Sequence, residues 1–142
     1  MSKLAVHFSS KHTEWETPQD FFDEQNKWFS FDLDVCALPG NAKCDKFFSP
    51  EDNGLEQEWT GTCWMNPPYG RGIASWIEKA ANCGCTVVCL LPARTDTAWF
   101  HDHILAAKLD GRATIKFIRG RLKFGGAKNS APFPSMLVVF RA

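Results

Sequence analysis

Apolar side chains along this chain recur with two different periods, and each period predicts a different kind of element. Helical spacing, in which apolar residues return every three or four positions, runs through three stretches. The first helix is expected to open at Thr17-Pro18, with Thr17 as the N-cap and Pro18 as the first helical residue. The second and third helices are expected at about residues 71–82 and 96–108. In the first helix, the apolar stripe predicts one buried face made of Phe21, Phe22, Trp28 and Phe29.

Strand periods appear between these helices. Residues 31–35 alternate apolar and acidic side chains, which places Asp32 and Asp34 together on one face. Residues 62–65 predict a short strand, and residues 86–92 are apolar on both faces, as is usual for a central parallel strand. The two remaining predicted strands, which close the chain as a pair, are residues 113–124 and 135–141.

The order of these elements predicts one α/β domain spanning residues 1–142. Strands alternate with crossover helices before the final strand pair, which is the arrangement of an open α/β sheet. A chain of 142 residues is long enough for one compact core. Residues 36–61 are rich in Pro, Gly, Asn and Asp, so we expect a loop there, with one short strand at residues 46–48. Loops of this kind often carry functional residues.

Composition argues against several classes of protein. No apolar run approaches the roughly 18 residues that cross a membrane, and residues 1–12 are too weakly apolar for a secretory signal, so we expect a cytoplasmic protein. The six cysteines lack the paired C-x-x-C spacing of a zinc site, because Cys83 and Cys85 are separated by one residue. His101 and His103 lie two positions apart on a predicted helix and therefore face different ways. We expect reduced thiols and no bound metal.

Charge is distributed unevenly, although the net charge is zero. Residues 1–58 carry twelve acidic side chains and five lysines. Residues 59–110 carry four acidic and four basic side chains, and residues 111–142 contain no acidic residue. This asymmetry favours a C-terminal surface that faces a polyanion. A solvated basic strand pair, neutralised by the acidic half, explains the same pattern. The basic residues of this last part are Arg112, Lys116, Arg119, Arg121, Lys123, Lys128 and Arg141.

The segment Thr62–Gly70 reads TCWMNPPYG and places a rigid turn directly after a predicted strand. Asn-Pro and Tyr-Gly are also ordinary turn signals, which is the simpler explanation. Each proline fixes its own φ and lacks an N–H, so Asn66 Oδ1 and the neighbouring carbonyls stand out as acceptors beside the Tyr69 ring. Two acceptors and an aromatic face suit a planar group with an exocyclic NH₂, whose lone pair is otherwise delocalised into the ring.

The N-P-P-Y turn resembles motif IV of the amino-group methyltransferases that use S-adenosylmethionine, in particular the DNA adenine-N6 methyltransferases. Thr17-Pro18 is similar to motif X of this family, and the segment from Asp34 to Ala37 occupies the place of motif I. Residues 37–41 hold a single glycine where the family has a glycine-rich turn. Nearly the whole chain looks like the compact adenine-N6 methyltransferases of bacteriophages and prophages. Further segments that carry this resemblance are Trp15–Pro18, Phe31–Asp34, Ser49–Asp52, Leu90–Pro92, Pro92–Thr95 and Ile118–Gly126.

This resemblance implies a compact, Rossmann-like class I methyltransferase sheet with a C-terminal antiparallel strand pair and no separate target-recognition domain. It implies transfer of a methyl group from S-adenosylmethionine to adenine N6 in double-stranded DNA, after the base is flipped out. Asn66 and the Pro67 carbonyl would bind the amine, Pro68 would complete the catalytic turn, and Tyr69 would stack on the base. The implied cofactor contacts are Thr17, Pro18, Asp34, Ala37 and Asp52. The implied DNA contacts are Arg94, Arg119, Arg121, Lys123 and Lys128.

The resemblance further implies a monomer or weak homodimer in the cytoplasm of a bacterial host, where methylation would protect DNA from restriction or serve regulation. A protein glutamine-N5 methyltransferase would use the same turn chemistry, although the basic C-terminal part favours a phosphate-bearing substrate. A catalytically idle nucleic-acid-binding domain of the same fold is a third function, against which the intact Asn66 and Tyr69 argue. We expect bases to be read by a loop such as residues 125–134 or by a partner subunit, with a short recognition sequence or weak specificity.

Individual motifs also have purely structural explanations. A capping box accounts for Thr17-Pro18, and a solvated strand face accounts for Asp32 and Asp34. Core packing is expected for the aromatic residues on the predicted helices, which are Phe21, Phe22, Trp28, Trp76 and Trp99.

Overall fold

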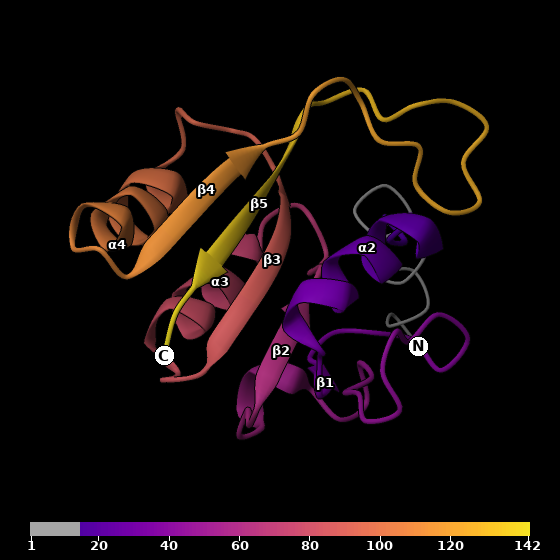
Figure 1. The fold of residues 1–142 in the computed structure, drawn as a ribbon, viewed down its shortest axis with the longest axis horizontal. Coiled ribbons are helices and arrows are strands. Elements are labelled where there is room, and N and C mark those ends of the chain that lie inside the picture. Colours follow the sequence, from indigo (N-terminus) through magenta and orange to yellow (C-terminus); the bar gives the residue numbers. More distant parts are fainter. Residues whose placement is uncertain (1–14) are drawn as a thin grey trace.

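A computed structural model describes residues 15–142; residues 1–14, which include the segment considered above for a secretory signal, lie outside the described part. One mixed five-stranded sheet organises the chain, with the strand order β1-β2-β3-β5-β4 (Figure 1). The strands β1, β2 and β3 run parallel, β5 is antiparallel to β3, and β4 is antiparallel to β5. The predicted α/β sheet and its closing antiparallel pair are therefore confirmed. The strands are β1 (Leu33–Asp34), β2 (Thr62–Met65), β3 (Thr86–Pro92), β4 (Ala113–Phe117) and β5 (Ser135–Phe140).

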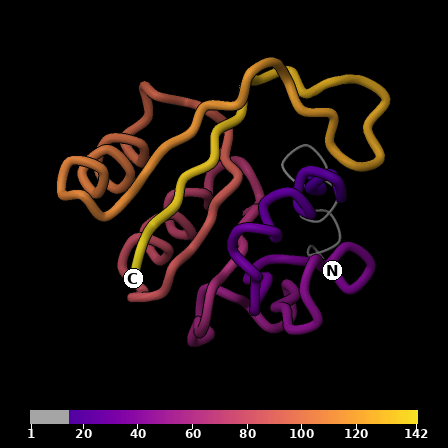
Figure 2. Tube along the Cα trace, viewed as in Figure 1, coloured from indigo at the N-terminus to yellow at the C-terminus, as the bar shows by residue number. Residues whose placement is uncertain are grey.

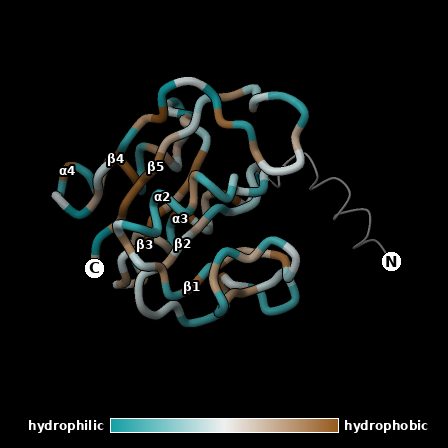
Figure 3. Tube along the Cα trace, turned by 45° about the vertical axis from the view of Figure 1, so that its right-hand side comes forward, coloured by the Kyte–Doolittle hydropathy of each residue, from teal (hydrophilic) through white to brown (hydrophobic). Residues whose placement is uncertain are grey.

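The core lies along the two central strands. Residues 87–92 of β3 and all residues of β5 are buried. The hydropathy colouring shows the apolar stretches gathered on the strands and the hydrophilic ones on the outer loops (Figure 3). The prediction of a central strand at residues 86–92, buried on both faces, is confirmed.

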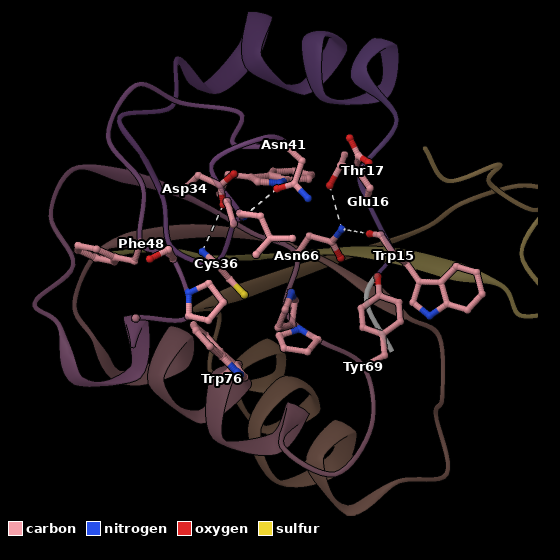
Figure 4. A pocket seen from close by; sticks show the side chains of 18 of the residues that line it. Trp15, Glu16, Thr17, Asp34, Cys36, Asn41, Phe48, Asn66, Tyr69 and Trp76 are labelled. Atoms are coloured by element: carbon pink, nitrogen blue, oxygen red, sulfur yellow. Dashed lines mark hydrogen bonds between the residues drawn. The ribbon is translucent and has the colours of Figure 1, made fainter. Parts of the chain in front are cut away.

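The helices form two layers around this sheet. Helix α2 (Gln19–Phe29) covers one face, and α3 (Ile73–Asn82) packs on the other beside a π-helical segment, η3 (Phe100–Leu105), and α4 (Ala106–Leu109) (Figures 1 and 4). A single 3₁₀ turn, η2 (Gly54–Glu56), interrupts the long loop between β1 and β2. The predicted helix at residues 96–108 is thus present, but its first part is wound as a π-helix instead of an α-helix.

The start of α2 differs from the prediction. The helix begins at Gln19, and Pro18 stands at the N-cap position in an extended conformation, with no side chain capping the helix. Its first main-chain bond runs from Phe22 N–H to the Pro18 carbonyl, at 3.0 Å. The predicted N-cap role of Thr17 is therefore wrong, because its hydroxyl oxygen accepts a hydrogen bond from Asn66 instead.

The buried face of α2 is narrower than predicted. Phe22 packs edge-on against Trp64 of β2, and Phe29 stacks on Phe31. Phe22 and Phe29 therefore define the face of α2 that meets the sheet. Trp28 lies about 100° around the helix from Phe29 and is 79% exposed. Its predicted burial is wrong, since the period places it at the margin of the stripe and the sheet does not reach that far.

The first strand is shorter than predicted, and one of its acids is buried. Residues 36–48 fold back over β1, and Phe47 pairs with Asp34 in an isolated parallel bridge, which is all that remains of the predicted strand at residues 46–48. Asp34 is only 2% exposed, so the alternative explanation by a solvated strand face does not apply to it. Asp32 stays exposed and accepts a hydrogen bond from Thr62 N–H.

The last predicted strand pair is also shorter. β4 ends at Phe117 rather than at residue 124, and residues 118–134 form a long excursion that crosses toward α2 (Figure 2). Gly120 adopts a φ of 75°, a conformation that side chains disfavour and that stops the extended chain. This excursion, called here the 118–134 loop, carries most of the predicted DNA contacts.

Two further predictions concern metal and membranes. Cys44, Cys63, Cys83, Cys85 and Cys89 are free thiols. Within residues 15–142, no group of three or more His, Cys, Asp or Glu side chains is arranged to hold a metal ion. No helix of this described part is long and apolar enough to cross a bilayer.

Candidate active site

A cavity of about 470 Å³ opens at the carboxyl ends of β1 and β2 (Figure 4). Its size lies within the range of about 300–1,000 Å³ that is usual for small-molecule sites. Its position is the one where open α/β sheets bind ligands, because loops leave the strand ends there. The walls come from the segment before α2, the loop after β1, the turn after β2 and the start of α3. Seven predicted site residues line it: Thr17, Asp34, Ala37, Asn66, Pro67, Pro68 and Tyr69.

Two predicted cofactor residues lie outside the cavity wall. Pro18 is half-buried at the start of α2 and does not line the cavity. Asp52 is exposed, and one carboxylate oxygen accepts hydrogen bonds from the main-chain N–H and the hydroxyl of Ser49, at 2.9 and 3.1 Å. It closes a local turn, which leaves neighbouring Ser49 and Asn53 to line the cavity.

Asn66, the first residue of the N-P-P-Y turn, is held by its amide nitrogen. Asn66 Nδ2 donates one hydrogen bond to the Trp15 carbonyl and another, of 2.9 Å, to Thr17 Oγ1 (Figure 4). Both partners precede α2 and are about fifty positions away in sequence. Helix α2 and strand β2 therefore bring together two motifs that the sequence resemblance placed in one site.

The amide oxygen of Asn66 has no partner. Asn66 Oδ1 is buried, and no donor in residues 15–142 forms a hydrogen bond with it. A buried carbonyl without a partner costs roughly 1–3 kcal/mol, so such groups in native proteins call for an explanation. Among the same residues, the Pro67 carbonyl is also left without a hydrogen bond, and Pro67 itself has no N–H to give. The turn thus offers two acceptors to a ligand.

Tyr69 lies at the side of the cavity next to Trp15 and is 3% exposed. Its hydroxyl donates to the Leu90 carbonyl in β3 at 3.1 Å, and burial raises the pKa of the phenol well above its ordinary value. Edge-on contacts from Phe124 and Phe133 cover the ring, with centroids 6.4 and 5.7 Å away. Tyr69 is therefore a neutral, firmly oriented aromatic surface beneath the 118–134 loop.

Asp34 gives the cavity its most perturbed acid. Burial raises the pKa of this carboxyl from its ordinary value of 3.8 to about 6, and hydrogen bonds from the main-chain N–H groups of Lys43 and Cys36 oppose the rise. Those bonds measure 3.0 and 3.3 Å. Near neutral pH the group is mostly a carboxylate, which stabilises the loop after β1 through its two N–H donors.

The Asp34 pKa predicts a pH dependence of stability. A folded-state pKa above the unfolded value means that the folded protein binds more protons, so this residue's contribution falls as pH rises from about 4 to 6. At about 1.4 kcal/mol per unit, the loss amounts to about 3 kcal/mol. Urea unfolding of the wild type and Asp34→Asn between pH 4 and 8 should show this change in the difference between them. A difference independent of pH would contradict the assignment.

The predicted DNA contacts are exposed, and four of the five lie on the 118–134 loop. Arg119, Arg121, Lys123 and Lys128 are exposed on the 118–134 loop, and exposed Arg94 follows β3 with its guanidinium 5.9 Å from the Phe133 ring centroid. The loop is tied to the cavity wall by a 2.8 Å hydrogen bond from Gly125 N–H to the Glu16 carbonyl. The loop that carries these basic residues is therefore anchored to the cavity wall, and the DNA contacts themselves stay a prediction.

Sequence patterns missed part of the wall. Lys43 and Asn41 belong to the loop after β1, which had no periodic signal beyond its turn-rich composition. Trp76 was assigned to the core, yet it is half-buried and lines the cavity. Helical spacing could not decide whether Trp76 packs in the core or lines a cavity, because both positions require the same apolar stripe on the helix.

Comparisons with known proteins show which family the chain belongs to. A family model described as DNA N-6-adenine-methyltransferase (Dam) matches residues 6–142. The DNA N-6-adenine-methyltransferase of Haemophilus phage HP1 (strain HP1c1) is 35% identical over 135 residues, covering 89% of this chain and 77% of the phage protein. The protein of the same name from Escherichia phage T1 is 35% identical over 92 residues, covering 61% of this chain and 38% of that protein. The chain belongs to the DNA N-6-adenine-methyltransferase (Dam) family.

Proposed function

We propose that this chain methylates adenine N6 in DNA by holding an extruded adenine between the Asn66–Pro67 acceptors and the Tyr69 ring, with S-adenosylmethionine as the methyl donor. Family membership supports the reaction class. The single observation that carries the proposal is the buried, unpartnered oxygen of Asn66 at the cavity wall. An acceptor left without a donor in the free protein suits a ligand that brings one, and the adenine N6 amine brings two hydrogens.

The two acceptors address the difficulty of the reaction. The N6 lone pair is delocalised into the adenine ring, so the amine is a weak nucleophile until it becomes tetrahedral. Hydrogen bonds to Asn66 Oδ1 and the Pro67 carbonyl favour that geometry, and because both groups are fixed in advance, no reorganisation is needed in the transition state. Bound S-adenosylmethionine would supply the methyl group to this lone pair and leave as the neutral thioether, and the methylated amine, held by Asn66 Oδ1 and the Pro67 carbonyl, would lose a proton to water.

The cavity fits the proposed methyl donor. When bound, S-adenosylmethionine supplies an electrophilic methyl group on a positively charged sulfur. Thr17, Asp34 and Ala37 line the space in which it would lie, and the Asp34 carboxylate suits a cationic amino group. Gly54 also lines this space, and its lack of a side chain lets η2 pack closely on the end of β1, because a Cβ at this position would stand 2.3 Å from the Val35 carbonyl oxygen.

Entry of a base requires movement of the 118–134 loop. Phe124 and Phe133 cover the Tyr69 ring in the free protein, so an adenine reaches it only after these two side chains shift. The same loop carries basic residues that suit DNA phosphates. Phosphate binding can therefore help to offset the few kcal/mol that extrusion of a base costs.

We expect the loop to contribute electrostatic affinity. Replacing exposed Arg119 and Lys123 together with Ala should lower the slope of log affinity against log salt by about 2, because each phosphate contact contributes about 0.9. Fluorescence anisotropy with labelled duplex DNA measures this slope. Lys108→Ala, exposed on α4, serves as the control and should leave it unchanged. An equal slope for the double variant and the wild type would contradict the assignment.

Product analysis tests the proposal as a whole. The protein is incubated with duplex DNA and methyl-labelled S-adenosylmethionine, and the DNA is digested to nucleosides. Label should appear in N6-methyldeoxyadenosine. Label in glutamine residues of an added protein but not in DNA would favour the glutamine-N5 alternative, and the absence of transfer would favour an idle nucleic-acid-binding domain.

A further inference from the structure

We propose that Thr17 is a positioning residue that fixes the orientation of the Asn66 amide, and that this, more than cofactor contact, is its contribution to methyl transfer. The inference rests on the proposed function of Asn66. It assigns to Thr17 a role that neither a helix cap nor a cofactor contact explains. Thr17 is 4% exposed, and its oxygen accepts from Asn66 Nδ2 at 2.9 Å.

The orientation of the amide follows from the chemistry of its neighbours. The carbonyl of Trp15 can only accept a hydrogen bond, so the side of the Asn66 amide that faces it must be the NH₂ group. Thr17 Oγ1 takes the second hydrogen of the same nitrogen. With both hydrogens engaged, Oδ1 is left at the opposite end of the planar amide, buried and without a partner in the described residues.

Two bonds are needed because an amide rotates easily. The terminal torsion of Asn is broad, so one hydrogen bond to Trp15 would leave the amide free to tilt. The second bond, to Thr17, restricts that tilt and holds Oδ1 in place. A short β-branched residue suits this task, since its χ1 is restricted and its hydroxyl moves little.

The Trp15–Thr17 segment is itself held on its outer side. The Trp15 ring makes edge-on contacts with Phe124 and Phe133, with centroids 5.6 and 5.2 Å away. The Glu16 carbonyl accepts a hydrogen bond from Gly125 N–H. The 118–134 loop thus supports the segment whose inner side orients Asn66, which makes Thr17 part of a packed support rather than a mobile end.

The test compares Thr17→Val, which keeps the shape and removes the hydroxyl, with Thr17→Ser, which keeps the hydroxyl. Losing this bond should lower the single-turnover methylation rate at saturating DNA and cofactor about tenfold, given the usual size of one hydrogen bond. Thr17→Ser should restore the rate to within about threefold. The cofactor dissociation constant, from equilibrium dialysis, should change less than about twofold, since the hydroxyl acts through Asn66. Thr114→Val, exposed on β4, is the matched control.

A readout without cofactor or DNA separates orientation from binding. In the free protein, NMR should show slow hydrogen exchange for the Asn66 side-chain NH₂, identified by its loss in Asn66→Ala, and faster exchange in Thr17→Val. In the Asn66→Ala background, adding Thr17→Val should cause no further loss of rate, because the amide that Thr17 orients is already absent.

Three results would overturn the inference. One is an unchanged rate and unchanged exchange in Thr17→Val. Another is a cofactor dissociation constant raised about tenfold in Thr17→Val with an unchanged rate at saturating cofactor, which would restore the cofactor-contact role. The third is an undiminished effect of Thr17→Val in the Asn66→Ala background. A wild-type protein without methylation activity would overturn the proposed function as well, whereas an active wild type beside an unaffected Thr17→Val would overturn this inference alone.

Discussion

Asn66→Ala should lower the single-turnover rate of methyl transfer by about 10²–10³-fold, the usual cost of removing one preorganised group that stabilises a transition state. The residue supplies one of two acceptors for the N6 amine, and alanine leaves the Pro67 carbonyl alone. Without the second acceptor, one hydrogen bond fewer stabilises the tetrahedral form of the amine in the transition state. The rate is measured at saturating DNA and cofactor, so that binding does not enter.

The same substitution should have little effect on stability. It removes the bonds to Trp15 and Thr17, which is unfavourable, but it also removes a buried oxygen that has no partner in the described residues. These effects have opposite signs and similar sizes, roughly 1–3 kcal/mol. Thermal unfolding should therefore change by a few degrees at most. Asn82→Ala, exposed on α3, is the control for activity. Activity of Asn66→Ala within a fewfold of the wild type would contradict the role of the acceptor.

Gly54→Ala should weaken both the fold and cofactor binding. A Cβ at residue 54 would lie 2.3 Å from the Val35 carbonyl oxygen and 3.1 Å from the Trp76 ring, so the end of β1 or the start of α3 must move. Overpacking of this kind costs about 1–3 kcal/mol of stability. Because Gly54 lines the cavity, the displaced wall should also reduce cofactor affinity, about tenfold for each 1.4 kcal/mol of binding free energy that is lost.

Gly40→Ala provides a matched control for this substitution. Gly40 belongs to the same loop between β1 and β2, but a Cβ there meets nothing within 4 Å. Urea unfolding and equilibrium dialysis should therefore find Gly40→Ala close to the wild type. If Gly54→Ala unfolds and binds cofactor as Gly40→Ala does, the close packing of Gly54 on the end of β1 has no functional importance.

Local periodicity predicted most of the sheet because its strands are buried in patterns that only a strand supports. Residues 86–92 and 135–140 are apolar at every or nearly every position, and both became central strands. The sequence contains glycines that favour turns at Gly120 and Gly125-Gly126. The apolar residues Ile118, Leu122 and Phe124 nevertheless suggested a longer strand. Phe124 instead packs edge-on against Tyr69, and Ile118 and Leu122 are partly buried against the core, contacts that spacing cannot show.

The errors at Thr17 and Asp34 have one cause. Thr17 satisfies the local rules for an N-cap, and only the contact with Asn66, 49 positions away, decides otherwise. Alternation placed Asp34 on a polar face, but it could not show that residues 36–48 would cover that face. The site residues themselves were named through the resemblance and the N-P-P-Y turn. The irregular loop after β1 has no periodic pattern, so its residues in the cavity wall could not be predicted from the sequence.

The most direct test of the proposed chemistry is a crystal structure of the protein with duplex DNA and an unreactive analogue of S-adenosylmethionine. Asn66 Oδ1 and the Pro67 carbonyl should each lie about 2.7–3.2 Å from an extruded adenine N6, with the Tyr69 ring stacked on the base and Phe124 and Phe133 displaced. An adenine whose N6 is bound elsewhere, with Asn66 Oδ1 still lacking a partner, would contradict the central claim.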